Sequence, residues 1–321
     1  TYKEGKKTGL EKFYSDKGIL LGQGRYTDGI PAGKHYKNHP NNKKAYVAEF
    51  DDKGNMTCPA KEYDSEGALV KEYTMIDQMP EGSFKHWHVN GKLAIESFYK
   101  IGKHHGEQKE YYPSGQLKIL SFFNEGSRDK VYKEYSEKGI LLKEVNLKNG
   151  DKEGLLKEWF SNNNPKFEGY FKGDKPDGLH TFWYENGSPM RKLSFKEGEK
   201  EGWLRQWSQE GDLLSEEFYK KGKLEGTVLA FYGKDEVQHR LQFVDGQMEG
   251  EQQWFYPNNY LKRKVSFEGG KPKGKAITYF ENGSIFLEEN FIDGKPIGEQ
   301  KEYFSASSGE QTIAKLLFFD E

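Results

Sequence analysis

The sequence predicts an all-β protein, an elongated antiparallel β-meander of about thirteen β-hairpin repeats of 24 residues each. Three observations predict this fold. Glycines recur every 24 residues, aromatic rings recur at fixed distances from them, and the runs between glycines are only six to seven residues long. Such runs suit β-strands and are mostly too short for helices. A period of this size is typical of a stacked repeat array.

The reference position of the repeat is a glycine at the start of its first strand. One extra residue lies between Gly33 and the next reference position, which is Cys58. An aromatic ring follows five residues after the reference position in twelve of thirteen copies, and Asn38 breaks the column. The rings are Tyr14, Tyr63, Trp87, Tyr111, Tyr135, Trp159, Trp183, Trp207, Phe231, Phe255, Tyr279 and Tyr303. Rings favour strands, and this column is expected to form a structural ladder that fills a thin core.

A second small-residue column lies nine residues after the reference position. Its members are Gly18, Asn42, Gly67, Gly91, Gly115, Gly139, Asn163, Gly187, Gly211, Asp235, Asn259, Gly283 and Ser307. Asn and Asp are the residues that best tolerate positive φ after glycine. The column therefore predicts a left-handed backbone position in a tight turn rather than a ligand-binding glycine.

Two strands and two turns account for each repeat. The turn "YPSGQ" at 112–116 and the turn "YENGS" at 184–188 are expected to close hairpins, and Asn-Gly favours a type I′ connection. A second glycine turn, as in "FKEGEKEG" at 195–202, joins neighbouring repeats, which gives about 26 antiparallel strands. A parallel solenoid is the alternative. It would stack equivalent lysines about 4.8 Å apart, which is unfavourable for like charges. Those lysines are Lys61, Lys85, Lys109, Lys133 and Lys157.

One repeat array is expected to span residues 1–321. Its repeats are irregular at about 26–99, and its last repeat, at about 291–321, is modified by the insertion "SASSGEQT". Arrays of this kind draw their stability from contacts between neighbours. Either irregular segment is interpreted as a cap or as a local binding loop.

Composition narrows the class of function. The net charge of −2 gives no global attraction to nucleic acid, and no apolar run approaches the ~20 residues that span a bilayer. We therefore expect neither nucleic-acid binding nor membrane insertion. The one cysteine, Cys58, excludes an internal disulfide framework. An exported or cell-surface location is slightly favoured over the cytoplasm, but the compartment is left open, because the sequence begins inside a repeat.

The spacing Gly-x-x-x-Gly followed by Tyr-Tyr-x-x-Gly-x-Leu resembles the MORN-variant repeat of bacterial proteins, including the YwqK-type antitoxins. The stretches "GKHHGEQKEYYPSGQLK" at 102–118 and "GGKPKGKAITYFENGSI" at 269–285 carry this resemblance best. It covers essentially the whole chain and implies consecutive β-hairpins. The antitoxin name implies an association with secreted toxins, but the repeat itself specifies no target. Lipid binding, linked to classical MORN repeats, is not implied, because their Gly-x-Gly pairing is missing.

No catalytic pattern emerges, so the chain is expected not to be an enzyme and to need no cofactor. The repeated Glu110, Glu134, Glu158 and Glu302 lie beside lysines and indicate a solvated charge ladder rather than a unique acid–base pair. A metal site at His86, His88, His104 and His105 is geometrically possible, although variable solvent-facing positions explain these residues more simply.

Two functions remain. The first is a scaffold for protein–protein interaction, of which an immunity or antitoxin role would be one case. The second is a cell-surface array that stacks carbohydrate on exposed rings. The candidate binding residues are Trp87, Trp159, Trp183, Trp207, Lys85, Lys109, Lys133 and Lys157. The partner's identity and the oligomeric state are left open.

Overall fold

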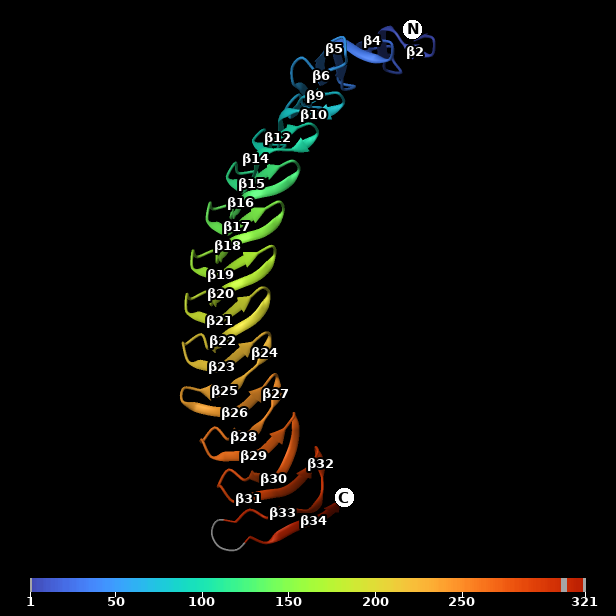
Figure 1. The fold of residues 1–321 in the computed structure, drawn as a ribbon. Helices are drawn as coiled ribbons and strands as arrows, with labels where there is room; N and C mark the ends of the chain where they lie inside the picture. Colours follow the sequence, from blue (N-terminus) through green and yellow to red (C-terminus); the bar gives the residue numbers. More distant parts are fainter. Residues whose placement is uncertain (1, 307–310, 320–321) are drawn as a thin grey trace. The chain divides into compact units, whose positions relative to one another are not determined.

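The structure is a computed structural model that describes residues 2–306 and 311–319. It divides into two compact units, one ending at Asn163 and one beginning at Asn164. Strands follow one another in chain order within each unit (Figure 1). The predicted Ser307 of the second small-residue column, and part of the modified last repeat, lie outside the described residues.

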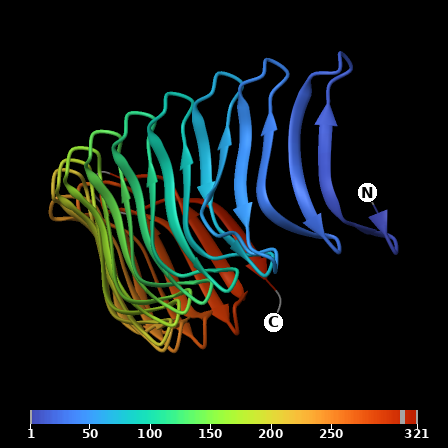
Figure 2. The same ribbon diagram turned by 90° about the horizontal axis from the view of Figure 1, so that it is seen from above.

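The first unit holds strands β1 to β18. They are β1 (Tyr2–Lys3), β2 (Lys6–Lys7), β3 (Gly9–Tyr14), β4 (Leu20–Thr27), β5 (Ile30–Asn38), β6 (Lys44–Phe50), β7 (Ala60–Tyr63), β8 (Leu69–Tyr73), β9 (Met75–Ile76), β10 (Met79–Pro80), β11 (Gly82–Trp87), β12 (Leu93–Lys100), β13 (Lys103–His104), β14 (Gly106–Tyr111), β15 (Leu117–Asn124), β16 (Ser127–Tyr135), β17 (Leu141–Lys148) and β18 (Asp151–Trp159). Successive hairpins of this unit lie side by side in Figure 2.

The second unit repeats the same plan with strands β19 to β34. They are β19 (Pro165–Lys172), β20 (Lys175–Trp183), β21 (Pro189–Lys196), β22 (Glu199–Trp207), β23 (Leu213–Lys220), β24 (Lys223–Leu224), β25 (Gly226–Gly233), β26 (Glu236–Val244), β27 (Gln247–Met248), β28 (Gly250–Phe255), β29 (Leu261–Glu268), β30 (Lys271–Tyr279), β31 (Ile285–Ile292), β32 (Lys295–Pro296), β33 (Gly298–Tyr303) and β34 (Ile313–Phe319). Neighbouring strands pair antiparallel, as in β20 with β21 and β30 with β31, which confirms the meander.

The reference glycines bend the strands. Their φ values lie between +61° and +100°, a left-handed conformation that inserts a bulge into the ladder. Near Gly178, for example, Gly169 pairs with His180 and the next residue, Tyr170, pairs with Asp177. The two residues of β20 between these pairs, Gly178 and Leu179, therefore have no partner in β19. The bulge can split one strand into two short ones, such as β13 and β14. The described residues therefore form more than the predicted 26 strands, although the number of hairpins is unchanged.

The second small-residue column is left-handed as predicted. Its twelve described members have φ between +61° and +97°. The type I′ prediction at Asn186-Gly187 is wrong, because only Gly187 has positive φ. The amide of Tyr184 donates to the carbonyl of Ser188 at 2.9 Å, which closes a three-residue loop rather than a two-residue one. The turns between repeats do have two positive-φ central residues, as at Glu125 (+48°) and Gly126 (+89°).

The core lies two residues after each reference position. Eight residues of this column are at most 9% exposed, namely Ala60, Leu156, His180, Leu204, Val228, Gln252, Ala276 and Gln300. Their cross-strand partners include the buried Val145, Leu193 and Leu241. The expectation that the ring column fills the core is therefore wrong. Strand alternation puts those rings on the opposite face, where they are mostly half-buried.

Replacing Gly283 by valine should lower the free energy of unfolding by about 1–2 kcal/mol, whereas replacing it by asparagine should cost less. Gly283 has φ +84° and no atom within 4 Å of where a Cβ would lie, so the cost arises from the backbone alone. Asparagine already occupies this column at Asn259, with φ +63°. Denaturant unfolding of both variants measures the difference. Equal cost for valine and asparagine would contradict the conformational explanation.

Candidate functional site

The surface with the greatest chemical variety is the face of the sheet opposite the core. We call it the open face and define it by the residues one position after each reference position, together with their cross-strand partners. The first set is Leu10, Lys34, Pro59, Ser83, Glu107, Val131, Leu155, Leu179, Trp203, Thr227, Glu251, Lys275 and Glu299. Many of these side chains are exposed, and the set mixes apolar, polar and charged residues without a single dominant type. A fixed backbone thus presents a variable surface.

An apolar cluster occupies the open face in the second unit. Leu179 is 56% exposed, Tyr170 46% and Trp203 44%. Trp203 lies across from Phe218 in the strand register, and their ring centroids are 5.1 Å apart in an edge-to-face arrangement. The guanidinium of Arg205 lies 5.2 Å from the Trp203 ring. Tryptophan, tyrosine and arginine are the side chains most enriched at energetically important interface positions.

The four predicted tryptophans lie at the turn end of their strands and are half-buried. Trp183 pairs with Pro189 and Trp207 with Leu213, and the ammonium of Lys192 lies 5.9 Å from the Trp207 ring. Trp87 and Trp159 end β11 and β18 in the first unit. Each ring is thus partly covered by its own hairpin. Their proposed role in binding stays a prediction.

The four predicted lysines belong to a ladder of alternating charges. In the first unit the strand register sets lysines opposite glutamates, in the pairs Lys61–Glu72, Glu72–Lys85, Lys85–Glu96, Glu96–Lys109, Lys133–Glu144 and Glu144–Lys157. Lys85 contacts Glu96 at 3.3 Å, Lys133 contacts Glu144 at 3.2 Å, and Lys109 pairs with Glu107. Because the charges alternate, this stripe offers little net attraction to an anionic partner.

Two histidines of the possible metal cluster, His88 and His104, have structural partners. His88 Nε2 lies 2.9 Å from the carbonyl oxygen of Tyr111, one repeat further on. His104 lies between the rings of Tyr99 and Phe123, with centroid distances of 4.3 and 5.0 Å, and burial lowers its pKa. Among the described residues no group of three His, Cys, Asp or Glu side chains is placed to hold a metal ion.

Polar side chains of the buried column bond to the backbone beside the bulge. His180 Nε2 lies 2.8 Å from the carbonyl oxygen of Tyr170, and His35 Nε2 lies 2.8 Å from that of Arg25. Gln252 accepts from the Gln242 amide at 2.7 Å and donates to the Gln242 carbonyl at 3.1 Å. These side chains serve backbone groups that the bulge takes out of the regular ladder. Their hydrogen bonds thus stabilise the bulge.

Burial lowers the pKa of His180 below its ordinary value of 6.5, against a smaller opposing effect of its bond to Tyr170. Below about pH 6.5 the unfolded chain therefore takes up a proton that the folded chain resists, and stability falls until the folded pKa is reached. We expect the unfolding midpoint to fall between pH 7 and pH 5, and to fall less in His180→Gln. Glutamine occupies this column at Gln252. An unchanged pH dependence in the variant would exclude His180 as the cause.

Hydrogen bonds join neighbouring repeats along both rows of turns, at the two ends of the strands. They were not predicted from the sequence. At the hairpin turns, asparagine amides donate to a carbonyl one repeat on, as from Asn90 to Pro113 at 2.7 Å and from Asn186 to Gln209 at 3.1 Å. In the turns that join one repeat to the next, a glutamate carboxylate accepts a hydrogen bond from a backbone amide, as Glu201 does from Lys221 at 2.7 Å. The signal was an acidic residue that recurs just before the reference glycine, as at Glu201, Glu225 and Glu249.

Comparison with family models identifies the repeat. Five segments match the MORN repeat variant, at residues 80–100, 105–125, 176–197, 248–268 and 272–293. No curated protein matches the sequence. Among solved structures, crystal structures of TcdB2–TccC3–Cdc42 and of TcdB2–TccC3–TEV are similar at 11% identity, with TM-scores of 0.19 and 0.17. The matches cover 96% and 98% of this chain but only 16% and 23% of those chains. No helix in the described residues has the length and apolar character needed to cross a membrane.

Proposed function

We propose that this chain, which carries repeats of the MORN variant, is a non-enzymatic scaffold that binds a protein partner through the open face of its hairpins. The observation that carries the proposal is the apolar cluster of Tyr170, Leu179 and Trp203, with Phe218 across from Trp203, on the open face of the second unit. An immunity or antitoxin role is one form that such binding could take.

The chemistry of the cluster favours a protein over a small ligand. Three of its side chains are between 44% and 56% exposed, so the cluster is a raised apolar patch rather than an enclosed cavity. In stable protein interfaces, an apolar centre that becomes buried on binding is surrounded by a polar rim. Arg205 beside Trp203, and Thr227 one repeat on at the same position, supply polar groups at its border.

Binding through the open face predicts a position-specific effect of mutation. The double variant Leu179→Ser, Trp203→Ala should weaken capture of the partner from a lysate of the source organism by more than ~10-fold, because truncating the few side chains that dominate an interface removes about 2 kcal/mol or more. The matched control is Leu10→Ser. Leu10 occupies the same repeat position and is 51% exposed, but it lies across from Arg25 rather than from a ring.

The variants and the control are compared by quantifying the same captured protein by mass spectrometry. Loss of the captured protein with the double variant, and its retention with Leu10→Ser, would support the proposal. Equal recovery with all three proteins, or equal loss with Leu10→Ser, would contradict it. Thermal unfolding of each variant shows whether the fold is retained.

Carbohydrate binding is the second candidate, and a hollow in the second unit favours it. This hollow has a volume of about 450 Å³ and is lined by Tyr232, His239, Trp254, Arg263 and Thr278 among others. A ring with nearby hydrogen-bonding groups suits a sugar. Titration with oligosaccharides should then quench the fluorescence of wild type but not of Trp254→Phe. An identical response in both proteins would contradict sugar stacking on Trp254.

A further inference from the structure

The repeat pattern changes in the first unit between β6 and β7. The reference position there is Cys58, which does not adopt the left-handed conformation of the reference glycines. The usual two-residue turn is replaced by a loop in which the Asp51 carboxylate accepts from the amides of Lys53 (2.9 Å) and Asn55 (2.8 Å). Insertions in repeat arrays often mark a binding surface.

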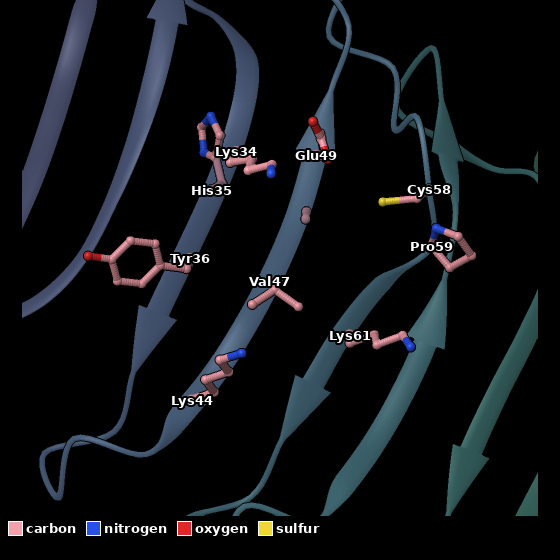
Figure 3. Close-up of a pocket in the computed structure, with 10 residues that line it drawn as sticks. Lys34, His35, Tyr36, Lys44, Val47, Glu49, Cys58, Pro59 and Lys61 are labelled. Carbon is pink, nitrogen blue, oxygen red and sulfur yellow. The ribbon is translucent and has the colours of Figure 1, made fainter.

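A pocket of about 400 Å³ lies at this irregularity (Figure 3). Strands β5 and β6 form one side, and the segment that leads into β7 forms the other, with the sulfur of Cys58 directed toward β6. Tyr36, Val47, Ala48 and Pro59 give the lining its apolar part. A pocket of this volume suits a small molecule.

Charge around the pocket is unbalanced. Lys34, Lys44, Lys61 and Glu49 line it. Lys61 is already paired with Glu72 at 3.3 Å, whereas Lys34 and Lys44 form no ion pair within the described part of the chain. Two ammonium groups against one carboxylate leave one formal positive charge, on a chain whose net charge is −2. An apolar wall with an excess ammonium group matches a monoanion that has an apolar body.

We propose that this pocket binds a small organic carboxylate with an aryl or alkyl group, with Lys34 and Lys44 receiving the carboxylate and Val47, Ala48 and Pro59 contacting the apolar part. The site is distinct from the apolar cluster of the second unit and does not depend on the protein partner. The two proposals can therefore fail separately.

Cys58 offers a direct readout, because it is the one cysteine of the chain and is exposed in the pocket wall. The rate of its alkylation by iodoacetamide is measured with increasing 3-phenylpropanoate or hexanoate, and with their uncharged amides. We expect the carboxylates to slow alkylation saturably and the amides to bind at least ~10-fold more weakly, the effect of losing one charge-assisted contact.

Two lysine variants locate the charge. Lys34→Gln and Lys44→Gln should each weaken protection by the carboxylates several-fold. Lys37→Gln removes the same charge from the same strand but on its other face, where Lys37 lies over the Phe13 ring, and it should leave protection unchanged. No protection by either carboxylate, equal protection by the amides, or an equal effect of Lys37→Gln would each overturn the proposal.

Discussion

Replacing Leu204 by alanine should lower the free energy of unfolding of the second unit by about 3 kcal/mol, within the 2–5 kcal/mol typical of a buried leucine. Leu204 is 5% exposed and belongs to the column two residues after the reference glycine. If that column is the core, removing its branched side chain leaves a cavity between hairpins that the rigid ladder cannot close. Guanidinium-induced unfolding, followed by circular dichroism, measures the loss.

The matched control is Leu179→Ala in the same unit. Leu179 is 56% exposed on the open face, so the same substitution should change the free energy of unfolding by at most about 0.5 kcal/mol. The comparison separates burial from strand propensity, because both residues lie in first strands of neighbouring repeats. Similar losses for the two variants would place the core elsewhere.

The second large effect is expected for Gln252→Leu, at about 2–3 kcal/mol. Gln252 is fully buried, and its amide group bonds to Gln242 and to the carbonyl oxygens of Glu249 and Gly250 at 3.1 and 3.2 Å. Leucine keeps roughly the same volume but leaves the Gln242 amide without its acceptor. A buried donor that loses its acceptor costs more than the average hydrogen bond contributes.

Gln253→Leu is the control for that substitution. Gln253 is the next residue along β28, and strand alternation puts its side chain on the opposite face, where its amide donates to the Glu251 carboxylate. Its replacement should cost less than about 0.5 kcal/mol. If Gln252→Leu proves as mild as Gln253→Leu, the bond of Gln252 to the backbone of Gln242 does not support the bulge.

The hairpin fold could be predicted from the sequence because it depends on backbone conformation. Positive φ accepts few residue types, so the turn column at Gly115 and Asn259 is visible as a period even without an alignment. The same property explains the one wrong turn type. Asn186-Gly187 is compatible with two kinds of turn, and the loop length, set by the Tyr184–Ser188 pair, decides between them.

The core could not be predicted in the same way, because its column varies in chemistry. Ala276, Leu204 and Gln252 fill equivalent positions, and no single residue type or chemical class marks the column. Packing adjusts to local space, and a polar member is accepted where it satisfies a backbone group at the bulge. The conspicuous rings, such as Trp183, recur because they cover the hairpin turn rather than because they fill the interior.

The residues of the apolar cluster could not be predicted from the sequence. The binding residues predicted from the sequence belong to the repeating tryptophan and lysine columns. Repetition favours a structural role, and Lys85 is indeed opposite Glu96. The exposed Leu179 and Trp203 stand out only when exposure is known, since their column also holds glutamate and serine.

Photocrosslinking tests the central claim most directly. The photoreactive residue benzoylphenylalanine is placed singly at Ser194 and at Thr227, which border the apolar cluster on the open face. It is also placed singly at two positions in the hairpin turns, Asn186 and Gln209, which serve as the edge positions for comparison. Illumination in a lysate of the source organism is followed by mass spectrometry. The account predicts that one protein is crosslinked from Ser194 and Thr227 and not from the edge positions. Crosslinks confined to the edge positions, or none at the open face, would contradict it.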